Sequence, residues 1–266
     1  MSPLIVSIIS LSIIFLATTL GSGLVFFFKK PYSERVNSII IGLASGIMIS
    51  VTFFGLLKPS MEEGANLYGE KLAFVPALVG FLLGALLLFI LDRVVPHLHK
   101  GIDFSEEEGP TNTKVSSRMK FFLAVTLHNI PEGMAVGLAC GIAFSNLTND
   151  SMMSALSLAI GIAIQNFPEG SAVSIPLRGD GMSRTKSFLF GMGSGVVEPI
   201  FGVIAIFLAS YLTSLVPYLL AFAGGAMIYV TIDDLIPEFK NSKFDHFGMW
   251  AFIIGFAIMM VLESVL

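Results

Sequence analysis

The sequence predicts an all-α polytopic membrane protein with eight transmembrane helices. Of its 266 residues, 55% are hydrophobic and only 13% are charged, and its mean hydropathy is +0.85. Soluble globular chains carry about 25% charged residues, so this chain lacks the polar side chains needed to cover a water-facing surface. Its apolar residues also fall into eight runs, each near the roughly 20 residues that a helix needs to cross a bilayer.

The eight expected spans follow one another with short connections, except between the third and the fourth. They are residues 4–28, 36–57, 72–95, 119–144, 152–177, 188–212, 215–236 and 247–265. The first run lacks the basic start and the cleavage site of a secretory signal, and we expect it to be a retained helix. The long connection, 97–118, combines a Glu triplet with Gly-Pro and several Ser and Thr residues, a composition that favours a mobile cytoplasmic loop. We expect residues 1–266 to form one transmembrane domain.

Basic residues predict the orientation of these spans. The first, third, fifth and seventh connections carry 13 of the 15 Lys and Arg residues, and the second connection carries the other two. Cytoplasmic loops hold the excess of basic residues in membrane proteins. Both termini are therefore expected outside the cytoplasm, and the compact loops favour a prokaryotic plasma membrane.

Two similar polar motifs interrupt the fourth and fifth spans. They read LHNIPEGMAV from residue 127 and IQNFPEGSAV from residue 164. Residues four apart share a helix face, so His128 lies over Glu132 and Gln165 lies over Glu169. The proline before each glutamate removes a backbone donor and favours a kink. Such a break is tolerated in a membrane where it is buried in protein or lines a wet cavity.

The carboxylates at this depth need a neutralising partner. Glu132, Glu169 and Glu198 all fall inside expected spans. An ionised side chain at the bilayer centre costs about 2.5–3.5 kcal/mol even on the gentler scales. No Lys or Arg is expected at the same depth, which leaves protons or a metal ion. One imidazole with several carboxylate and amide oxygens suits divalent ions such as Zn²⁺, Fe²⁺, Mn²⁺ or Cd²⁺.

The segments HNIPEG and QNFPEG resemble the two signature helices of the ZIP (Zrt/Irt-like) family of divalent metal transporters, most of all its GufA-type branch. The resemblance covers nearly the whole chain. It implies an inverted-repeat bundle of three, two and three helices, an elevator-like motion, a homodimer, and metal uptake into the cytoplasm. The metal ligands that it implies are His128, Asn129, Glu132, Gln165, Asn166, Glu169, Glu198 and Met48.

Two departures from the family pattern bear on selectivity. Many ZIP proteins have His where this chain has Gln165, and some relatives have Asp where it has Asn166. Both changes remove a good zinc ligand, so we expect looser selectivity, with cadmium, iron or manganese accepted beside zinc. The exit pathway is expected to involve Asp233 and Asp234 near the cytoplasmic end of the seventh span, together with His97 and His99 in the long loop.

The glutamates are expected to bridge two neighbouring metal positions. Glu132 and Glu169 would repel each other at close range unless cations lie between them. One position would add His128 and Gln165, with Met48. The second position would be completed by Asn129, Asn166 and Glu198.

Other functions remain open from the sequence. A catalytic zinc needs about three protein ligands and one open position, so the same His and Glu cluster could serve an intramembrane metal-dependent hydrolase. The chain has no H-E-x-x-H motif, and we expect no enzyme activity and no cofactor beyond the transported ion. A proton relay would leave the amides without a role. The expected partners are divalent ions and the lipid bilayer, with no nucleic acid.

Overall fold

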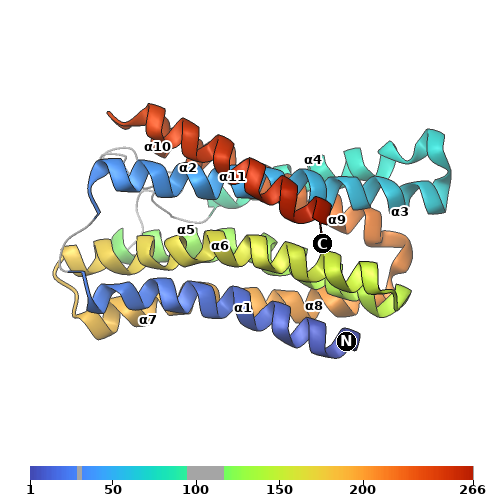
Figure 1. Cartoon of the computed structure of the whole chain (residues 1–266), viewed down its shortest axis with the longest axis horizontal. Helices are drawn as coiled ribbons and strands as arrows, with labels where there is room; N and C mark the ends of the chain where they lie inside the picture. The colour runs from blue at the N-terminus through green and yellow to red at the C-terminus, as the bar shows by residue number, and fades with distance from the viewer. Residues whose placement is uncertain (29–31, 95–116, 266) are drawn as a thin grey trace.

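The computed structural model describes residues 1–28, 32–94 and 117–265, and within these ranges it contains helices and no strand (Figure 1). The helices run roughly parallel to one long axis. The longer ones are α1 (Pro3–Gly23), α2 (Glu34–Ser50), α3 (Lys58–Tyr68), α4 (Phe74–Val94), α5 (Ser117–Asn146), α6 (Asn149–Gly179), α7 (Arg184–Gly195), α8 (Val197–Tyr211), α9 (Val216–Val230) and α11 (Asp245–Val265). The shorter ones are α10 (Ile236–Lys240), the 3₁₀ turns η1 (Leu24–Phe26), η3 (Glu70–Leu72) and η4 (Thr213–Leu215), and the π-helical segments η2 (Val51–Leu57) and η5 (Thr231–Leu235).

Seven helical segments in the described chain are long and apolar enough to cross a membrane, which confirms the expected all-α polytopic class. They are Pro3–Phe26, Glu34–Tyr68, Glu70–Arg93, Asn149–Gly179, Arg184–Tyr211, Thr213–Lys240 and Asp245–Val265. The remaining expected span, 119–144, falls within α5, a 30-residue helix that packs along α8. Its hydropathy is lowered by the polar residues of its own motif. The long connection 97–118 lies outside the described residues except for its last two, which begin α5.

The helix pairing has an internal symmetry. The four most extensive interfaces join α1 to α6, α5 to α8, α2 to α11, and α4 to α9. If the first three spans are exchanged in order for the last three, and α5 for α6, the pair α1–α6 becomes α8–α5. The same exchange turns the pair α2–α11 into α9–α4. The middle span of each half also contains a π-helical segment, η2 or η5. This is the arrangement expected of an inverted repeat.

Glycines allow the paired helices to approach at backbone distance. A methyl group on Gly42 of α2 would overlap the backbone of Gly248 on α11, and one on Gly84 of α4 would overlap the backbone of Phe222 on α9. Small residues at such crossings favour van der Waals packing between membrane helices, where the hydrophobic effect contributes little. The sequence places these glycines on the faces that the pairing buries.

The second span is longer than the sequence led us to expect. Residues 58–71 were expected as a connection, but the helix continues from Glu34 to Tyr68, which gives about 50 Å at 1.5 Å per residue. Pro59 comes just after the π-helical segment η2, in which the regular hydrogen-bond ladder of the helix is already interrupted. Ser60 Oγ donates a 2.6 Å hydrogen bond to the Pro217 carbonyl and ties this extension to α9. The extension ends at Gly69, whose φ is +80°.

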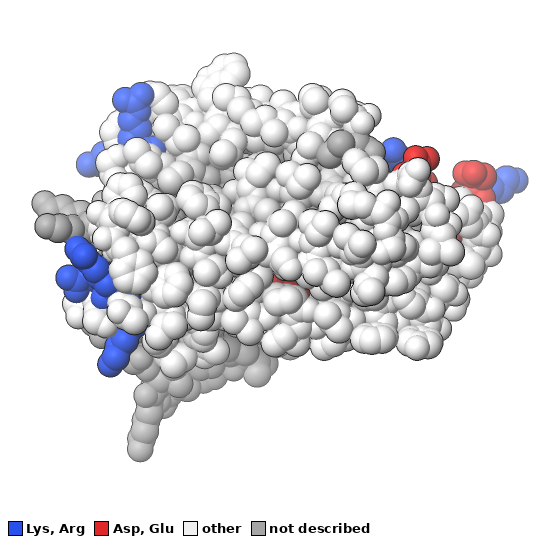
Figure 2. Space-filling view, turned by 60° about the horizontal axis from the view of Figure 1, so that its bottom comes forward, with Lys and Arg blue, Asp and Glu red and all other residues white. Residues whose placement is uncertain are grey.

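Charged side chains gather at the two ends of the bundle. On the face shown in Figure 2, Lys and Arg lie at one end, while both signs of charge lie at the other end. Described basic residues at the end where α2, α7 and α11 begin are Arg35, Arg178, Arg184, Lys186, Lys240 and Lys243. The opposite end, beside α3, carries Lys58 and Lys71. Most of the described basic residues therefore gather at one end of the bundle.

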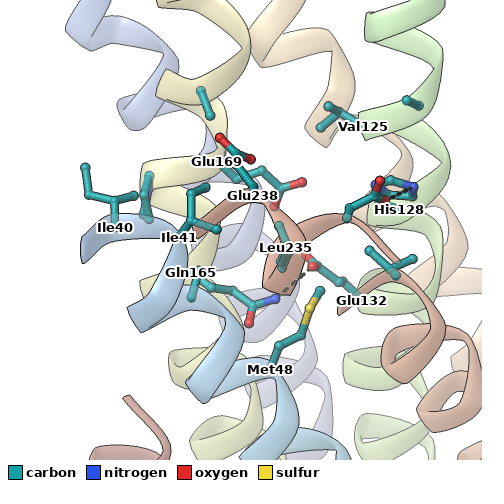
Figure 3. Close-up of a pocket in the computed structure, with 16 residues that line it drawn as sticks. Ile40, Ile41, Met48, Val125, His128, Glu132, Gln165, Glu169, Leu235 and Glu238 are labelled. Atoms are coloured by element: carbon teal, nitrogen blue, oxygen red, sulfur yellow. Dashed lines mark hydrogen bonds and ion pairs between the residues drawn. The ribbon is translucent and has the colours of Figure 1, made fainter. Parts of the chain in front are cut away.

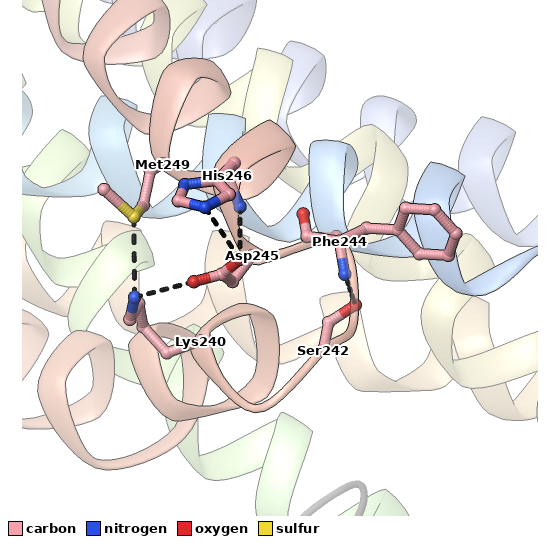
Figure 4. Close-up of polar contacts among 7 residues, drawn as sticks. Lys240, Ser242, Phe244, Asp245, His246 and Met249 are labelled. Carbon is pink, nitrogen blue, oxygen red and sulfur yellow. Dashed lines mark hydrogen bonds and ion pairs between the residues drawn. The ribbon is translucent and has the colours of Figure 1, made fainter.

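A polar network fixes the turn between α10 and α11 (Figure 4). Lys240 Nζ lies 3.1 Å from Asp245 Oδ2 and 3.5 Å from Met249 Sδ. Glu34 Oε1, at the start of α2, accepts hydrogen bonds from the Lys243 backbone N–H at 2.8 Å and from Ser242 Oγ at 3.3 Å. These contacts fasten the turn to α2 at the basic end of the bundle.

Candidate functional site

A pocket with about 90 Å³ of space lies among α2, α5, α6 and the α9–α10 segment (Figure 3). Most of its lining is Ile, Ala, Val, Leu and Pro. The remaining lining residues are Met48, His128, Glu132, Gln165, Glu169, Asp234 and Glu238. None of the lining residues is Lys or Arg. Five of the eight ligands expected from the sequence therefore share one pocket.

The polar partners inside this pocket come from different helices. Gln165 Nε2 on α6 donates a 2.7 Å hydrogen bond to Glu132 Oε1 on α5. His128 Nε2 on α5 lies 3.2 Å from Asp234 Oδ2 on η5. The sequence placed His128 over Glu132 on one helix face, and both do line the pocket. The residue that pairs with His128 in the structure is Asp234.

Glu132 has one carboxylate oxygen without a hydrogen bond in the described chain. The whole residue is buried, and its Oε2 makes no hydrogen bond within the described part of the chain. Oε1 of Gln165 is also buried without a hydrogen bond there. Glu169 lines the same pocket, and Glu198 on α8 is fully buried. Because buried charges of one sign are costly without compensation, this cluster calls for cations or protons.

A second group of expected ligands lies outside the pocket lining. Asn129, Asn166 and Glu198 are fully buried. Oε1 of Glu198 accepts hydrogen bonds from Thr18 Oγ1 at 2.8 Å and from Asn129 Nδ2 at 3.2 Å. Its Oε2 makes no hydrogen bond in the described chain, and neither polar side-chain atom of Asn166 makes one there. Asn129 Nδ2 also donates to the Ser194 carbonyl at 3.1 Å.

Met48 lies in the pocket wall and is almost completely buried, with 4% of its surface exposed. Thr231 Oγ1 lies 2.9 Å from Met48 Sδ and also donates to the Met227 carbonyl at 2.7 Å. Figure 3 shows Met48 beside Gln165 and Glu132. The thioether is therefore held where it faces the carboxylate–amide pair.

The two aspartates expected on the exit pathway lie in different surroundings in the structure. Asp234 lines the pocket itself, but its neighbour Asp233 is exposed and does not line it. Consecutive helical residues point in different directions, so one of the two aspartates faces the pocket. His97 and His99 lie outside the described residues.

Sequence reasoning left two polar contributors without a role. Glu238 lines the pocket and accepts a 2.8 Å hydrogen bond from Asn37 Nδ2 on α2. A signal was available for it, because Glu238 follows a proline, as both motif glutamates do, and comes four residues after Asp234. Thr18 holds Glu198, yet it stands in an apolar run that gives no such signal.

The side chains are not arranged as a finished metal site. Within the described residues, no three His, Cys, Asp or Glu side chains are grouped closely enough to hold one ion. Instead Gln165 bonds to Glu132, and His128 pairs with Asp234. An ion would therefore need amide or thioether donors as well, or side chains that turn from their present partners.

Comparison with known proteins decides the family. The model of the family described as ZIP zinc transporter matches residues 2–120 and 105–263. This chain belongs to the ZIP zinc transporter family. The zinc transporter ZIP11 of Xenopus tropicalis is 34% identical over 98% of this chain and 97% of its own length. GufA of Myxococcus xanthus, also a zinc transporter, is 36% identical over 93% of each chain.

The resemblance drawn from the two motifs of this ZIP-family chain is thus confirmed at the level of the family. A third relative, the zinc transporter ZIPB of Bordetella bronchiseptica, is 32% identical over 95% of this chain and 78% of its own. The names of all three relatives describe transport, which fits the expectation that the chain is not an enzyme.

Proposed function

We propose that this protein carries zinc, and also cadmium, iron or manganese, into the cytoplasm through a binuclear, carboxylate-bridged site between α5 and α6. The observation that carries the proposal is the group formed by Glu132, Glu169 and Glu198. Glu132 and Glu169 line one pocket that has no Lys or Arg in its lining, and Glu132 and Glu198 are fully buried. Divalent ions compensate such a group while using its oxygen atoms as ligands.

The arrangement of the remaining donors supports two positions rather than one. His128, Gln165 and Met48 line the pocket with both motif glutamates. Asn129, Asn166 and Glu198 are buried outside that lining. Glu132 and Glu169 would bridge the two groups. The first position holds the only imidazole and is the better zinc site.

The hydrogen bonds of the structure suit a site that must also release its ion. Gln165 bonds to one oxygen of Glu132, and Asp234 lies beside His128. Metal binding would replace these contacts, and metal release would restore them. The site can therefore empty without leaving all of its buried polar atoms unsatisfied, which lowers the cost of releasing the ion.

The exit path proposed here leads from His128 to the acidic residues of η5 and α10. Asp234 and Glu238 line the pocket, and Asp233 is exposed beside them. With the basic end of the bundle facing the cytoplasm, these acids lie on the way inward, and both termini lie outside. We place the protein in a prokaryotic plasma membrane as a homodimer, with residues 1–266 forming one transport domain.

Uptake into proteoliposomes tests the proposal. Protein reconstituted in vesicles should accumulate radioactive zinc, and a panel of competing ions should show cadmium, iron or manganese reducing that uptake. The variant Glu132→Gln with Glu169→Gln serves as the control and should be inactive. Metal binding without uptake would favour the hydrolase alternative, and proton movement without metal would favour a relay.

A further inference from the structure

We infer that Thr18 on α1 is a positioning residue, which turns the Glu198 carboxylate so that its Oε2 faces the second metal position. The inference rests on the two-position site proposed above. It concerns a hydroxyl group that lies outside the pocket lining.

The local geometry singles out this hydroxyl. Thr18 and Glu198 are both fully buried, and Thr18 Oγ1 lies 2.8 Å from Glu198 Oε1 and 3.3 Å from the Ile14 carbonyl. A hydroxyl has one proton, and the shorter contact to a charged acceptor is the stronger one. Asn129 Nδ2 reaches the same oxygen at 3.2 Å. Two donors on Oε1 fix the rotation of the carboxylate and leave Oε2 for another partner.

The internal symmetry of the fold gives an independent reason. Gly133 ends the first HNIPEG-type motif, and a methyl group on it would overlap the backbone of Glu198. Gly170 ends the second motif, and a methyl group on it would overlap the backbone of Thr18. The motif glycines thus pack at Glu198 in the α5–α8 pair and at Thr18 in the α6–α1 pair. Thr18 occupies in one half of the protein the place that Glu198 occupies in the other.

This correspondence explains why a threonine suits the position. An acid at both places would bring two carboxylates to hydrogen-bond distance, where like charges repel. A threonine supplies a donor at the same point, so the contact between the two halves becomes favourable. One half therefore contributes the metal ligand, and the other half contributes the group that orients it.

Loss of the Thr18 hydroxyl should lower the affinity for zinc at the second position only. Oε1 of Glu198 would keep only the longer 3.2 Å contact from Asn129 Nδ2, whose other N–H donates to the Ser194 carbonyl. Removing a group that orients a metal ligand typically lowers metal affinity by about 10- to 100-fold. The first position should be unaffected, because Thr18 does not line the pocket.

Zinc titration of the purified full-length protein by calorimetry, with bound zinc counted by mass spectrometry, tests the inference. The wild-type protein should bind two ions with separable affinities. Thr18→Val should weaken the second affinity by about tenfold or more and leave the first unchanged. Thr18→Ser keeps the hydroxyl and should bind the second ion as tightly as the wild-type protein does. The matched control is Thr19→Val on the same helix, because the Thr19 hydroxyl is buried without a hydrogen bond in the described chain.

Each other outcome counts against a defined part of the account. Equal second affinities in Thr18→Val and wild type would overturn the positioning role. Parallel loss of both affinities, without rescue by serine, would make Thr18 a structural residue and overturn it too. A wild-type protein that binds one ion would refute the two-position proposal before any Thr18 variant is measured. If the valine variant is not monodisperse, Thr18→Ala against Thr18→Ser makes the same comparison.

Discussion

Gln165 on α6 donates a 2.7 Å hydrogen bond to Glu132 on α5, so the second copy of the polar motif directly contacts the first. Residues of both copies line the same pocket. We propose that Gln165 has two roles. Its nitrogen holds Glu132 in this structure, and its buried oxygen is free of hydrogen bonds within the described residues and can turn toward an ion.

A histidine at this position should change metal preference. Gln165→His replaces an amide with an imidazole, a stronger ligand for zinc than for harder ions such as manganese. We expect zinc to compete better against manganese during uptake, and zinc to be released more slowly. Competition assays in proteoliposomes check this, with wild-type protein as the reference. An unchanged metal profile would mean that Gln165 does not contact the ion.

Substitutions in the two positions should have unequal effects on transport. His128→Ala removes the only imidazole of the site and should abolish zinc uptake. Glu198→Ala should empty the second position yet leave measurable uptake through the first. Initial rates of radioactive zinc uptake, normalised to protein in the membrane, compare the two. Equal loss of activity in both variants would contradict the ranking of the positions.

Close packing at the motif glycine predicts a loss of stability. Gly133→Ala would push a methyl group into the backbone of Glu198, and the overlap should cost about 1–3 kcal/mol. The matched control is Gly23→Ala, because a methyl group there meets nothing within 4 Å. Thermal unfolding in detergent should show a lower midpoint for the first variant and little change for the second. Similar midpoints would argue against the tight α5–α8 crossing.

The orientation can be checked by labelling in intact cells. Replacing Cys140 removes the single native cysteine, and a cysteine is then introduced at Glu107 or at Lys71. The Glu107→Cys protein should resist impermeant thiol reagents, because the basic third connection is expected in the cytoplasm. Lys71→Cys at the opposite end should react. Ready labelling at position 107 would reverse the orientation.

The sequence was sufficient for the fold class and for five residues that prove to line one pocket. Apolar runs of spanning length and the repeated motif with His128 and Glu132 predicted both. The sequence could not tell that residues 58–68 extend the second span, because a short polar helix after an apolar run resembles a loop. It also could not show that Thr18 bonds to Glu198 or that Asp234 pairs with His128, because these contacts depend on which helices meet across the bundle.

The two-position site is tested most directly by anomalous diffraction from zinc-soaked crystals. The account predicts two neighbouring peaks bridged by Glu132 and Glu169, one beside His128 and Gln165 and the other beside Asn129 and Glu198. A single peak at saturating zinc, or peaks placed away from both bridging glutamates, would contradict it.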